Sequence, residues 1–330
     1  MKRTMTFYYV AYGLTFSSDL PIPGLACVES TSEHIKVHFT DCLNPDVRDE
    51  AKPFFTTDST DQFGEPILRA WKLKEPLGYR LRYCDGIEFT IAKSGKEIWC
   101  SRPSNMTIED VVVYLMGPIF GFVLRLRGQT CLHASVVNID DQAVALVGPG
   151  GSGKSTTAAA FVELGFPILT DDVAAITLEN GSCSIQPAYP HVRLWPQAVN
   201  MLYGHHGALP RLVPAGIWDK CYLDLKNRPN LFCTKRLPLR AVYTLEARLQ
   251  EGAPSLQTLS QAEAMLSLLA NGYANNLINR SLRAEEFRVL STIAGSIPIK
   301  RIHPHCDSQR IPELCKVIIR DVRSQHGPRH

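Results

Sequence analysis

The chain has 330 residues, of which 45% are hydrophobic and 20% are charged. This is an ordinary globular composition, and the length favours about two domains. The formal net charge of +3 comes from scattered lysines and arginines. Because nucleic-acid-binding proteins concentrate basic residues on one face, we expect no nucleic-acid partner.

The cysteines and the apolar stretches bear on the compartment. The ten cysteines include no C-x-x-C pair and no secretory signal opens the chain, so we predict reduced thiols and a cytoplasmic location. The longest apolar stretch, residues 111–124, is shorter than the roughly 20 residues that cross a bilayer, and Gly117 and Pro118 interrupt it. We predict a buried, kinked helix there and no membrane partner.

The first hundred residues favour a small β-rich domain over residues 1–105. Short strands separated by turn residues are predicted at 6–14, 34–39, 79–83, 87–92 and 97–100, and residues 50–66 indicate a polar excursion. No catalytic constellation stands out in this part. A docking domain for a partner or substrate and a purely structural cap are equal alternatives.

The second domain is predicted over residues 106–330. Thr107, with an acidic residue three positions later, predicts the start of a helix that runs to about residue 127. Strands at 130–139 and 143–147 then form a hairpin. A cluster of histidines and a cysteine at His303, His305 and Cys306 is too closely spaced for a tetrahedral zinc site without further ligands.

Residues 148–156, GPGGSGKST, fit the pattern G-x-x-x-x-G-K-[ST] between a predicted strand and a predicted helix. Glycines let consecutive N–H groups surround a polyphosphate, and the helix adds its positive end. Lys154 is expected to reach the β- and γ-phosphates, and the Ser155 hydroxyl to bind Mg²⁺. The alternative is a glycine-rich turn that binds nothing. The predicted nucleotide-binding residues are Gly148, Gly150, Gly151, Ser152, Gly153, Lys154, Ser155 and Thr156.

Downstream elements predict a mixed, largely antiparallel sheet. Strands are expected at 166–170, 173–178 and 183–186, with a hairpin turn at Asn180-Gly181. Further strands are expected at 221–225, 240–246 and 297–302, and helices at 197–203, 260–270, 282–294 and 311–322, with a mobile loop region at 204–238. An ordinary P-loop protein alternates strands with helices and builds a parallel sheet. Strand hairpins on both sides of the glycine loop therefore indicate a different α/β arrangement.

Two features are candidates for chemistry beside the phosphates. Asp171 and Asp172 end an apolar strand, so one carboxylate can stay ionised near Mg²⁺ while the other accepts a proton from an attacking hydroxyl. His133 lies in the preceding hairpin and is expected to neighbour these acids. A solvated Asp-Asp turn and a core or capping histidine are the alternatives.

LHASVV (132–137), the glycine loop and PILTDD (167–172) together resemble the HPr kinase/phosphorylase family. The likeness is strong over about residues 129–187 and weak to about 320. It implies that ATP and Mg²⁺ phosphorylate a serine hydroxyl in a polypeptide. It also implies that Asp171 activates the serine, that His133 and Asp172 complete the catalytic environment, and that Ser155 and Asp172 are the metal ligands. Family members are often oligomeric, which implies a homo-oligomer by analogy.

The family's Glu-Ile-Arg-Gly segment has no counterpart here, where residues 189–196 read YPHVRLWP. The β-rich N-terminus, LHAS, RLWP and the segment 220–223 are more similar to stand-alone relatives in peptide-modification gene clusters, which include kinases of lasso-peptide precursors. Arg193 and Lys220 are candidates for binding phosphate or a substrate carboxylate, with ordinary surface cations as the alternative.

The sequence therefore predicts an ATP-dependent serine kinase acting on a peptide, with the C-terminal serine of a lasso-peptide precursor as the acceptor. One alternative is a kinase or phosphorylase acting on HPr or another carrier protein. Another is a non-catalytic regulatory module that binds ATP, and a more distant one is a reaction like that of phosphoenolpyruvate carboxykinase.

Overall fold

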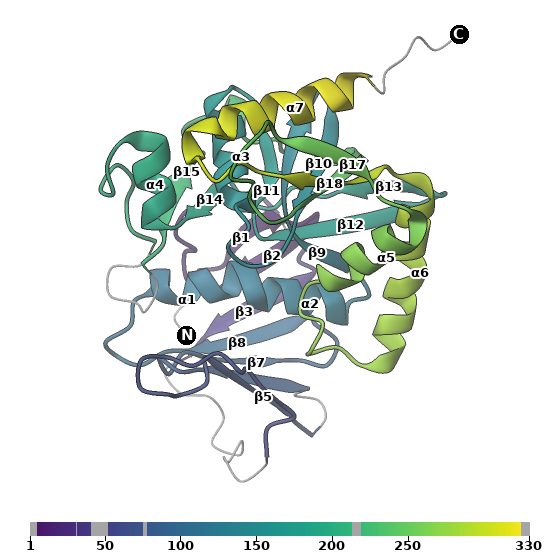
Figure 1. Ribbon diagram of the computed structural model, residues 1–330. Coiled ribbons are helices and arrows are strands. Elements are labelled where there is room, and N and C mark those ends of the chain that lie inside the picture. Colours follow the sequence, from purple (N-terminus) through teal and green to yellow (C-terminus); the bar gives the residue numbers. More distant parts are fainter. Residues whose placement is uncertain (1–4, 31, 41–51, 75–77, 213–218, 325–330) are drawn as a thin grey trace. The chain divides into compact units, whose positions relative to one another are not determined.

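The computed structural model describes residues 5–30, 32–40, 52–74, 78–212 and 219–324, and they form two compact units (Figure 1). The first unit consists of Met1–Gly128, Leu212–Asp219 and Ala274–Leu282. The second consists of Gln129–Arg211, Lys220–Tyr273 and Arg283–His330. The predicted domain boundary at 105/106 assigned the helix at 107–127 to the second domain, whereas these residues belong to the first unit.

The first unit contains an eight-stranded sheet in the order β1-β2-β3-β8-β7-β6-β5-β4. The predicted single strand at 6–14 is wrong, because Tyr12 and Gly13 have φ angles of 56° and 75° and form a tight turn. A strand at 68–72 was not predicted. The strands are β1 (Phe7–Ala11), β2 (Leu14–Ser18), β3 (Ile35–Phe39), β4 (Phe55–Thr56), β5 (Leu68–Lys72), β6 (Tyr79–Tyr83), β7 (Glu88–Ile91) and β8 (Glu97–Ser101).

A helical segment after β8 packs against this sheet, and this packing explains why the segment belongs to the first unit. Helix α1 (Ile108–Tyr114), the π-helical turn η1 (Leu115–Ile119) and α2 (Phe120–Leu126) follow one another. Thr107 and Asp110 form the predicted capping box, and a π-helical turn that contains Pro118 interrupts the predicted helix. The Phe120 ring lies 6.0 Å from that of Tyr12 and 4.9 Å from that of Phe16.

The second unit is built on a mixed sheet in the order β10-β9-β12-β13-β16-β18-β17, in which β10 also pairs with β16 and β11 pairs with β9. Strands β10, β16 and β18 are parallel, and the other pairings are antiparallel, as predicted. The strands are β9 (Thr130–Ile139), β10 (Gln142–Val147), β11 (Ile168–Thr170), β12 (Val173–Glu179), β13 (Ser182–Ile185), β16 (Leu237–Leu245), β17 (Ser255–Thr258) and β18 (Ile299–His303).

Turn chemistry fixes the hairpins of this sheet. Asn180 and Gly181 have φ angles of 50° and 78°, which confirms the predicted Asn-Gly turn between β12 and β13. Asp140 and Asp141, at 52° and 58°, form a turn of the same kind between β9 and β10. The second turn brings the chain back into β10, which leads directly into the glycine loop.

Helices cover both faces of the sheet in the second unit (Figure 1). One apolar cluster joins it to α3 (Lys154–Glu163), α4 (Pro196–Tyr203) and α7 (Ile311–Ser324). A second cluster joins the opposite face to α5 (Gln261–Ala270) and α6 (Arg280–Ser296). The glycine loop and its helix are therefore held on a rigid, well-packed scaffold.

A separate ribbon of β14 (His191–Leu194) and β15 (Cys221–Asp224) completes the second unit, with a 3₁₀ turn η2 (Pro229–Leu231) after it. Residues 213–218 of the loop region predicted at 204–238 lie outside the described residues. No helix in the described part of the chain is both long and apolar enough to span a membrane. Within those same residues no disulfide links the cysteines.

Candidate active site

The loop that follows β10 has the geometry of a phosphate-binding loop. Gly148, Gly151 and Gly153 have φ angles of 145°, 80° and 101°. A Cβ on Gly148 would lie 2.8 Å from the main-chain oxygen of Leu245, so no side chain fits there. Gly153 is the N-cap of α3, which places the positive end of a ten-residue helix at the loop. Backbone N–H groups and helix dipole thus favour an anion at one point.

Lys154 is buried at the centre of this loop, with 6% of its surface exposed. Its Nζ donates hydrogen bonds to the main-chain oxygens of Gly148 (2.7 Å) and Pro149 (3.1 Å). Burial lowers the pKa of Lys154 and the nearby Lys220 lowers it further, whereas Asp171 and Asp172 act in the opposite direction. A phosphate bound at the loop would supply negative charge that favours the ammonium form.

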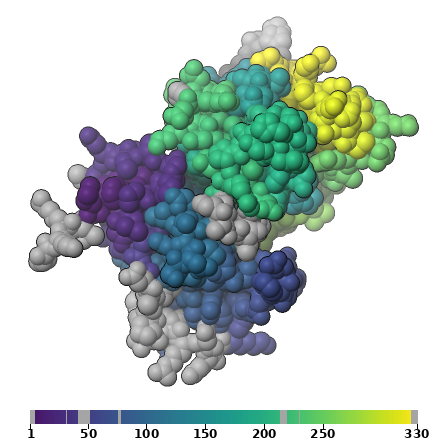
Figure 2. Space-filling view, turned by 90° about the vertical axis from the view of Figure 1, so that its left-hand side faces the viewer, coloured from purple at the N-terminus to yellow at the C-terminus, as the bar shows by residue number. Residues whose placement is uncertain are grey.

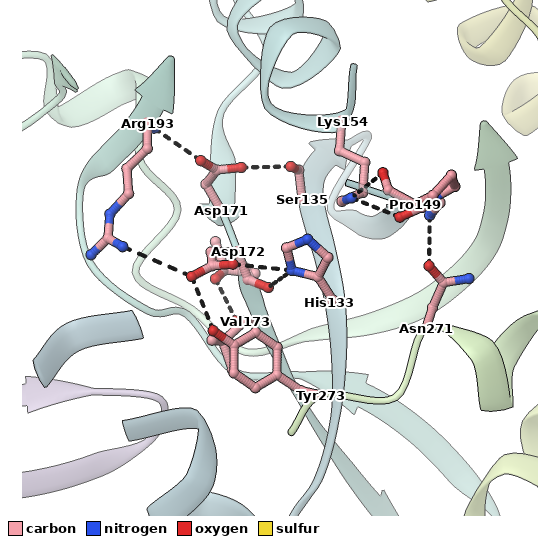
Figure 3. A network of polar contacts seen from close by, with 12 residues as sticks. His133, Ser135, Pro149, Lys154, Asp171, Asp172, Val173, Arg193, Asn271 and Tyr273 are labelled. Atoms are coloured by element: carbon pink, nitrogen blue, oxygen red, sulfur yellow. Dashed lines mark hydrogen bonds and ion pairs between the residues drawn. The ribbon is translucent and has the colours of Figure 1, made fainter. Parts of the chain in front are cut away.

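Asn271, the residue that ends α5, connects the loop to the neighbouring strand (Figure 3). Its Oδ1 accepts a hydrogen bond from the buried N–H of Gly148 at 2.9 Å, and its Nδ2 donates to the main-chain oxygen of Ser267 at 2.8 Å. Its own main-chain oxygen accepts from the N–H of His133 at 2.7 Å. One residue therefore fixes the loop relative to the strand that carries the histidine.

Asp171 is buried, with 3% of its surface exposed, and both of its carboxylate oxygens are held (Figure 3). Oδ1 accepts from the Ser135 hydroxyl at 2.6 Å, and Oδ2 accepts from the N–H of Arg193 at 2.9 Å. Each carboxylate oxygen can accept a second hydrogen bond. The carboxylate is thus oriented by the protein and retains acceptor capacity toward the cavity.

Asp172 lies among cationic and polar groups. Its Oδ1 is 3.0 Å from His133 Nδ1, while its Oδ2 accepts from the Tyr273 hydroxyl at 3.2 Å and lies 3.9 Å from Arg193 Nη1. Burial by itself raises the pKa of Asp172, but the hydrogen bond and charge of His133, with Arg193 and Lys220, outweigh it and lower that pKa. Asp172 is therefore held in its ionised form.

Two further cationic side chains, those of Arg193 and Lys220, lie near Asp172. The Arg193 guanidinium lies 5.8 Å from the centre of the Tyr189 ring, and Lys220 Nζ lies 5.0 Å from that of the Trp195 ring. Burial and the charge of Arg193 lower the pKa of Lys220, while the two aspartates raise it. The positions of the aromatic rings fix both cations beside Asp172.

These groups line one cavity of about 630 Å³. The cavity brings together all but one of the residues predicted from the sequence for catalysis, nucleotide and substrate; the exception is Gly148, which lies at the base of the loop. Its lining also includes residues that sequence reasoning did not single out. Ser135 had a usable signal, since it lies two positions after His133 and faces the same side of β9. Arg248 had none, because only the fold brings it to the glycine loop. Asn271 and Tyr273 are not part of the lining but contact Gly148 and Asp172, and they had no signal either.

The residues of the site could hold a magnesium ion if phosphate oxygens supplied further ligands. The described residues contain no group of three or more His, Cys, Asp or Glu side chains that could hold a metal by themselves. The Ser155 hydroxyl and the Asp172 carboxylate nevertheless both face the cavity. Mg²⁺ prefers oxygen ligands and is commonly held by one or two protein groups together with substrate phosphates. The residues present are suited to a metal that arrives with its nucleotide.

Comparison with known proteins shows a distant structural similarity. No family model matches the chain, and no curated protein matches it. Among solved structures, the chain is similar to the Hpr(Ser) kinase/phosphatase from Coxiella burnetii, with a TM-score of 0.34 and 15% sequence identity. The match covers 59% of this chain and 97% of that one.

Proposed function

We propose that the protein is an ATP-dependent kinase that phosphorylates a serine hydroxyl in a peptide or protein. The observation that carries the proposal is the convergence of a glycine-loop lysine, two aspartates and a histidine on one cavity. A glycine loop of this kind holds a nucleotide by its phosphates, and a carboxylate beside the terminal phosphate can accept the proton of an attacking hydroxyl.

The two aspartates differ in a way that assigns their roles. Asp172 has a lowered pKa because His133, Arg193 and Lys220 surround it, so it is a poor proton acceptor and a good partner for a cation. Asp171, oriented by Ser135 and the backbone of Arg193, is the proposed base. The serine oxygen bonds to the γ-phosphorus as its proton passes to Asp171. The bond from that phosphorus to the bridging oxygen breaks, and ADP leaves.

Other groups position and neutralise charge during this step. Lys154 and the N–H groups of the loop are placed to bind the β- and γ-phosphates. Ser155 and Asp172 would hold Mg²⁺, which neutralises charge on the phosphates when bound. His133 keeps Asp172 oriented through the contact at 3.0 Å. Most of the rate enhancement would come from positioning and electrostatics.

The acceptor we propose is a peptide whose last residue is serine, as in lasso-peptide precursors. Arg193 and Lys220 place two cations beside the proposed base, and a C-terminal carboxylate next to the reacting hydroxyl suits them. The test compares a peptide ending in serine with the same peptide carrying a C-terminal amide. Loss of phosphorylation with the amide supports a terminal carboxylate, and equal rates contradict it.

The kinase assignment is tested by incubating the protein with ATP, Mg²⁺ and a panel of peptides and carrier proteins, and locating phosphate by mass spectrometry. Asp171→Asn should lower the rate by about 10²-fold or more while ATP affinity changes only a few-fold. Asp140→Asn, in a turn of the same unit where Asp140 pairs with Arg323, is the matched control. Undiminished turnover of Asp171→Asn would remove the residue from the role. ATP binding without any phosphorylated product would identify a regulatory module instead.

A further inference from the structure

The sheet of the second unit places loops from three parallel strands at one edge. Because β10, β16 and β18 are parallel neighbours, their carboxyl ends open on the same side. The loop after β10 is the glycine loop, the residues after β16 reach Arg248, and those after β18 reach His305. In open α/β sheets, ligands bind at this edge of the strands.

The order of the strands separates two ends of the cavity. On one side of β10 lies β9, whose Ala134 pairs with Val147, so His133 and the two aspartates lie there. On the other side lie β16 and then β18. The glycine loop therefore has the acids on one side and the segment from Arg248 to His305 on the other. A nucleotide held by the loop with its γ-phosphate toward the acids must extend its nucleoside toward β16 and β18.

The cavity has the right lining at that second end. Arg248 Nη2 lies 3.7 Å from where a Cβ on Gly153 would be, so the guanidinium overlooks the start of α3. Pro304 and Leu314 are buried and Ile311 is half-buried, which gives an apolar floor. His305 adds a half-buried ring whose Nδ1 accepts from the N–H of Asp307 at 2.9 Å. An apolar surface with a few polar groups suits a nucleobase.

The part of the cavity beside α4 differs in character. It is lined by Trp195, Ala198 and Met201 from the start and first turns of α4, with Lys220 above the Trp195 ring. Trp195 is 45% exposed. In the space-filling view the green surface of this segment lies toward the viewer, beside the yellow surface of α7 (Figure 2). This part is open to an incoming acceptor and adjoins the proposed base.

We propose that the nucleoside of the bound ATP occupies the end lined by Arg248, Pro304, His305, Ser308, Ile311 and Leu314. Arg248 faces the α-phosphate, and the base lies against Ile311, Leu314 and the His305 ring. The acceptor peptide enters beside α4, on the side of the phosphate loop that carries the aspartates. The inference rests on the proposed kinase function, because that function sets the direction of the γ-phosphate.

Photo-cross-linking of the wild-type protein with 8-azido-ATP tests the assignment directly. After digestion, mass spectrometry should find the label in the peptide containing residues 304–314, with labelling abolished by excess ATP. Label in residues 195–201 would overturn the proposal. The proposal would also be overturned if excess ATP failed to reduce the labelling of every labelled peptide.

Binding measurements give a second readout. His305→Ala should weaken ATP binding by about tenfold, in the range that loss of base stacking produces. Binding of inorganic tripolyphosphate, which has no base, should change less than twofold. His206→Ala, at an exposed histidine beyond α4, is the matched control and should alter neither. Equal weakening of ATP and tripolyphosphate by His305→Ala would contradict a base-binding role.

The phosphotransfer assay distinguishes failure of the two proposals. Label at 304–314 without any phosphorylated product would support the nucleoside site and remove the kinase assignment. Phosphorylated product with label at 195–201 would leave the kinase assignment standing and overturn the nucleoside site.

Discussion

Asn271 offers the sharpest test of how the site is assembled, because its side chain takes no part in the proposed chemistry. Asn271→Ala removes the acceptor of the Gly148 N–H and the donor to the Ser267 oxygen. A buried donor left without a partner costs about 1–3 kcal/mol. We expect the free energy of unfolding of the second unit to fall by that amount, since Gly148 is buried.

The same substitution should also loosen the glycine loop relative to the strand of His133. We expect nucleotide affinity to fall by about tenfold, which is roughly 1.4 kcal/mol, while Asp171 and Asp172 keep their contacts. Urea denaturation, followed by the fluorescence of the second unit, measures the loss of unfolding free energy. Isothermal titration with ATP measures the loss of nucleotide affinity. Both losses are expected in the same variant because one side chain supports both.

Asn138→Ala is the matched control in the same unit. The Asn138 Oδ1 is buried and has no hydrogen-bond partner, so its removal should leave stability unchanged or raise it. Asn138 lies near the far end of β9, away from the glycine loop. If Asn271→Ala matches this control within about 0.5 kcal/mol, the scale of surface substitutions, and binds ATP normally, Asn271 does not position the loop.

Three further predictions concern single charged groups. Lys154→Met should lower phosphotransfer by about 10²-fold or more, as loss of a preorganised charge does. Rate assays with the variant and the wild type check this. Glu88→Gln should destabilise the first unit by about 3 kcal/mol, since it leaves buried Arg80 without the carboxylate that it contacts twice at 2.7 Å; urea melts that match wild type would contradict it. Burial lowers the pKa of His191 from 6.5 to about 4, against the opposing charge of Asp224. As pH falls, His191 therefore binds a proton in the unfolded chain before it does so in the folded one. The free energy of unfolding should drop by up to about 3 kcal/mol between pH 6.5 and 4. The drop should be absent in His191→Phe, which keeps the ring packing.

The glycine loop and its neighbours could be predicted because their signals are local. The spacing of Gly148, Gly153 and Lys154 fits a known phosphate-loop pattern. Gly148, Gly151 and Gly153 have positive φ angles, which glycine adopts without steric cost. The Asn180-Gly181 turn and the capping box at Thr107 are also short-range features. Each depends on a few consecutive residues whose conformational preferences agree with the fold.

The remaining residues of the site are brought together only by long-range contacts. Asn271 and Tyr273 follow α5, more than 100 positions after the residues they contact, and no pattern around them indicates a role. Arg248 and His305 come to the loop because β16 and β18 are parallel to β10. The misprediction of a single strand at 6–14 has a local cause, since Tyr12 is not a typical turn residue even though Gly13 follows it.

The pairing of two adjacent aspartates in one cavity requires a break in the strand. Successive residues of a regular β-strand point to opposite faces, so Asp171 and Asp172 would then face apart. Here β11 ends at Thr170, β12 begins at Val173, and Asp172 adopts a φ of 84°, which is costly for a residue with a side chain. His133, Arg193 and Tyr273 contact the carboxylate that this conformation turns toward the cavity. Those contacts offset the backbone strain, so the residues that set the charge of Asp172 also maintain the turn that gives the site both acids.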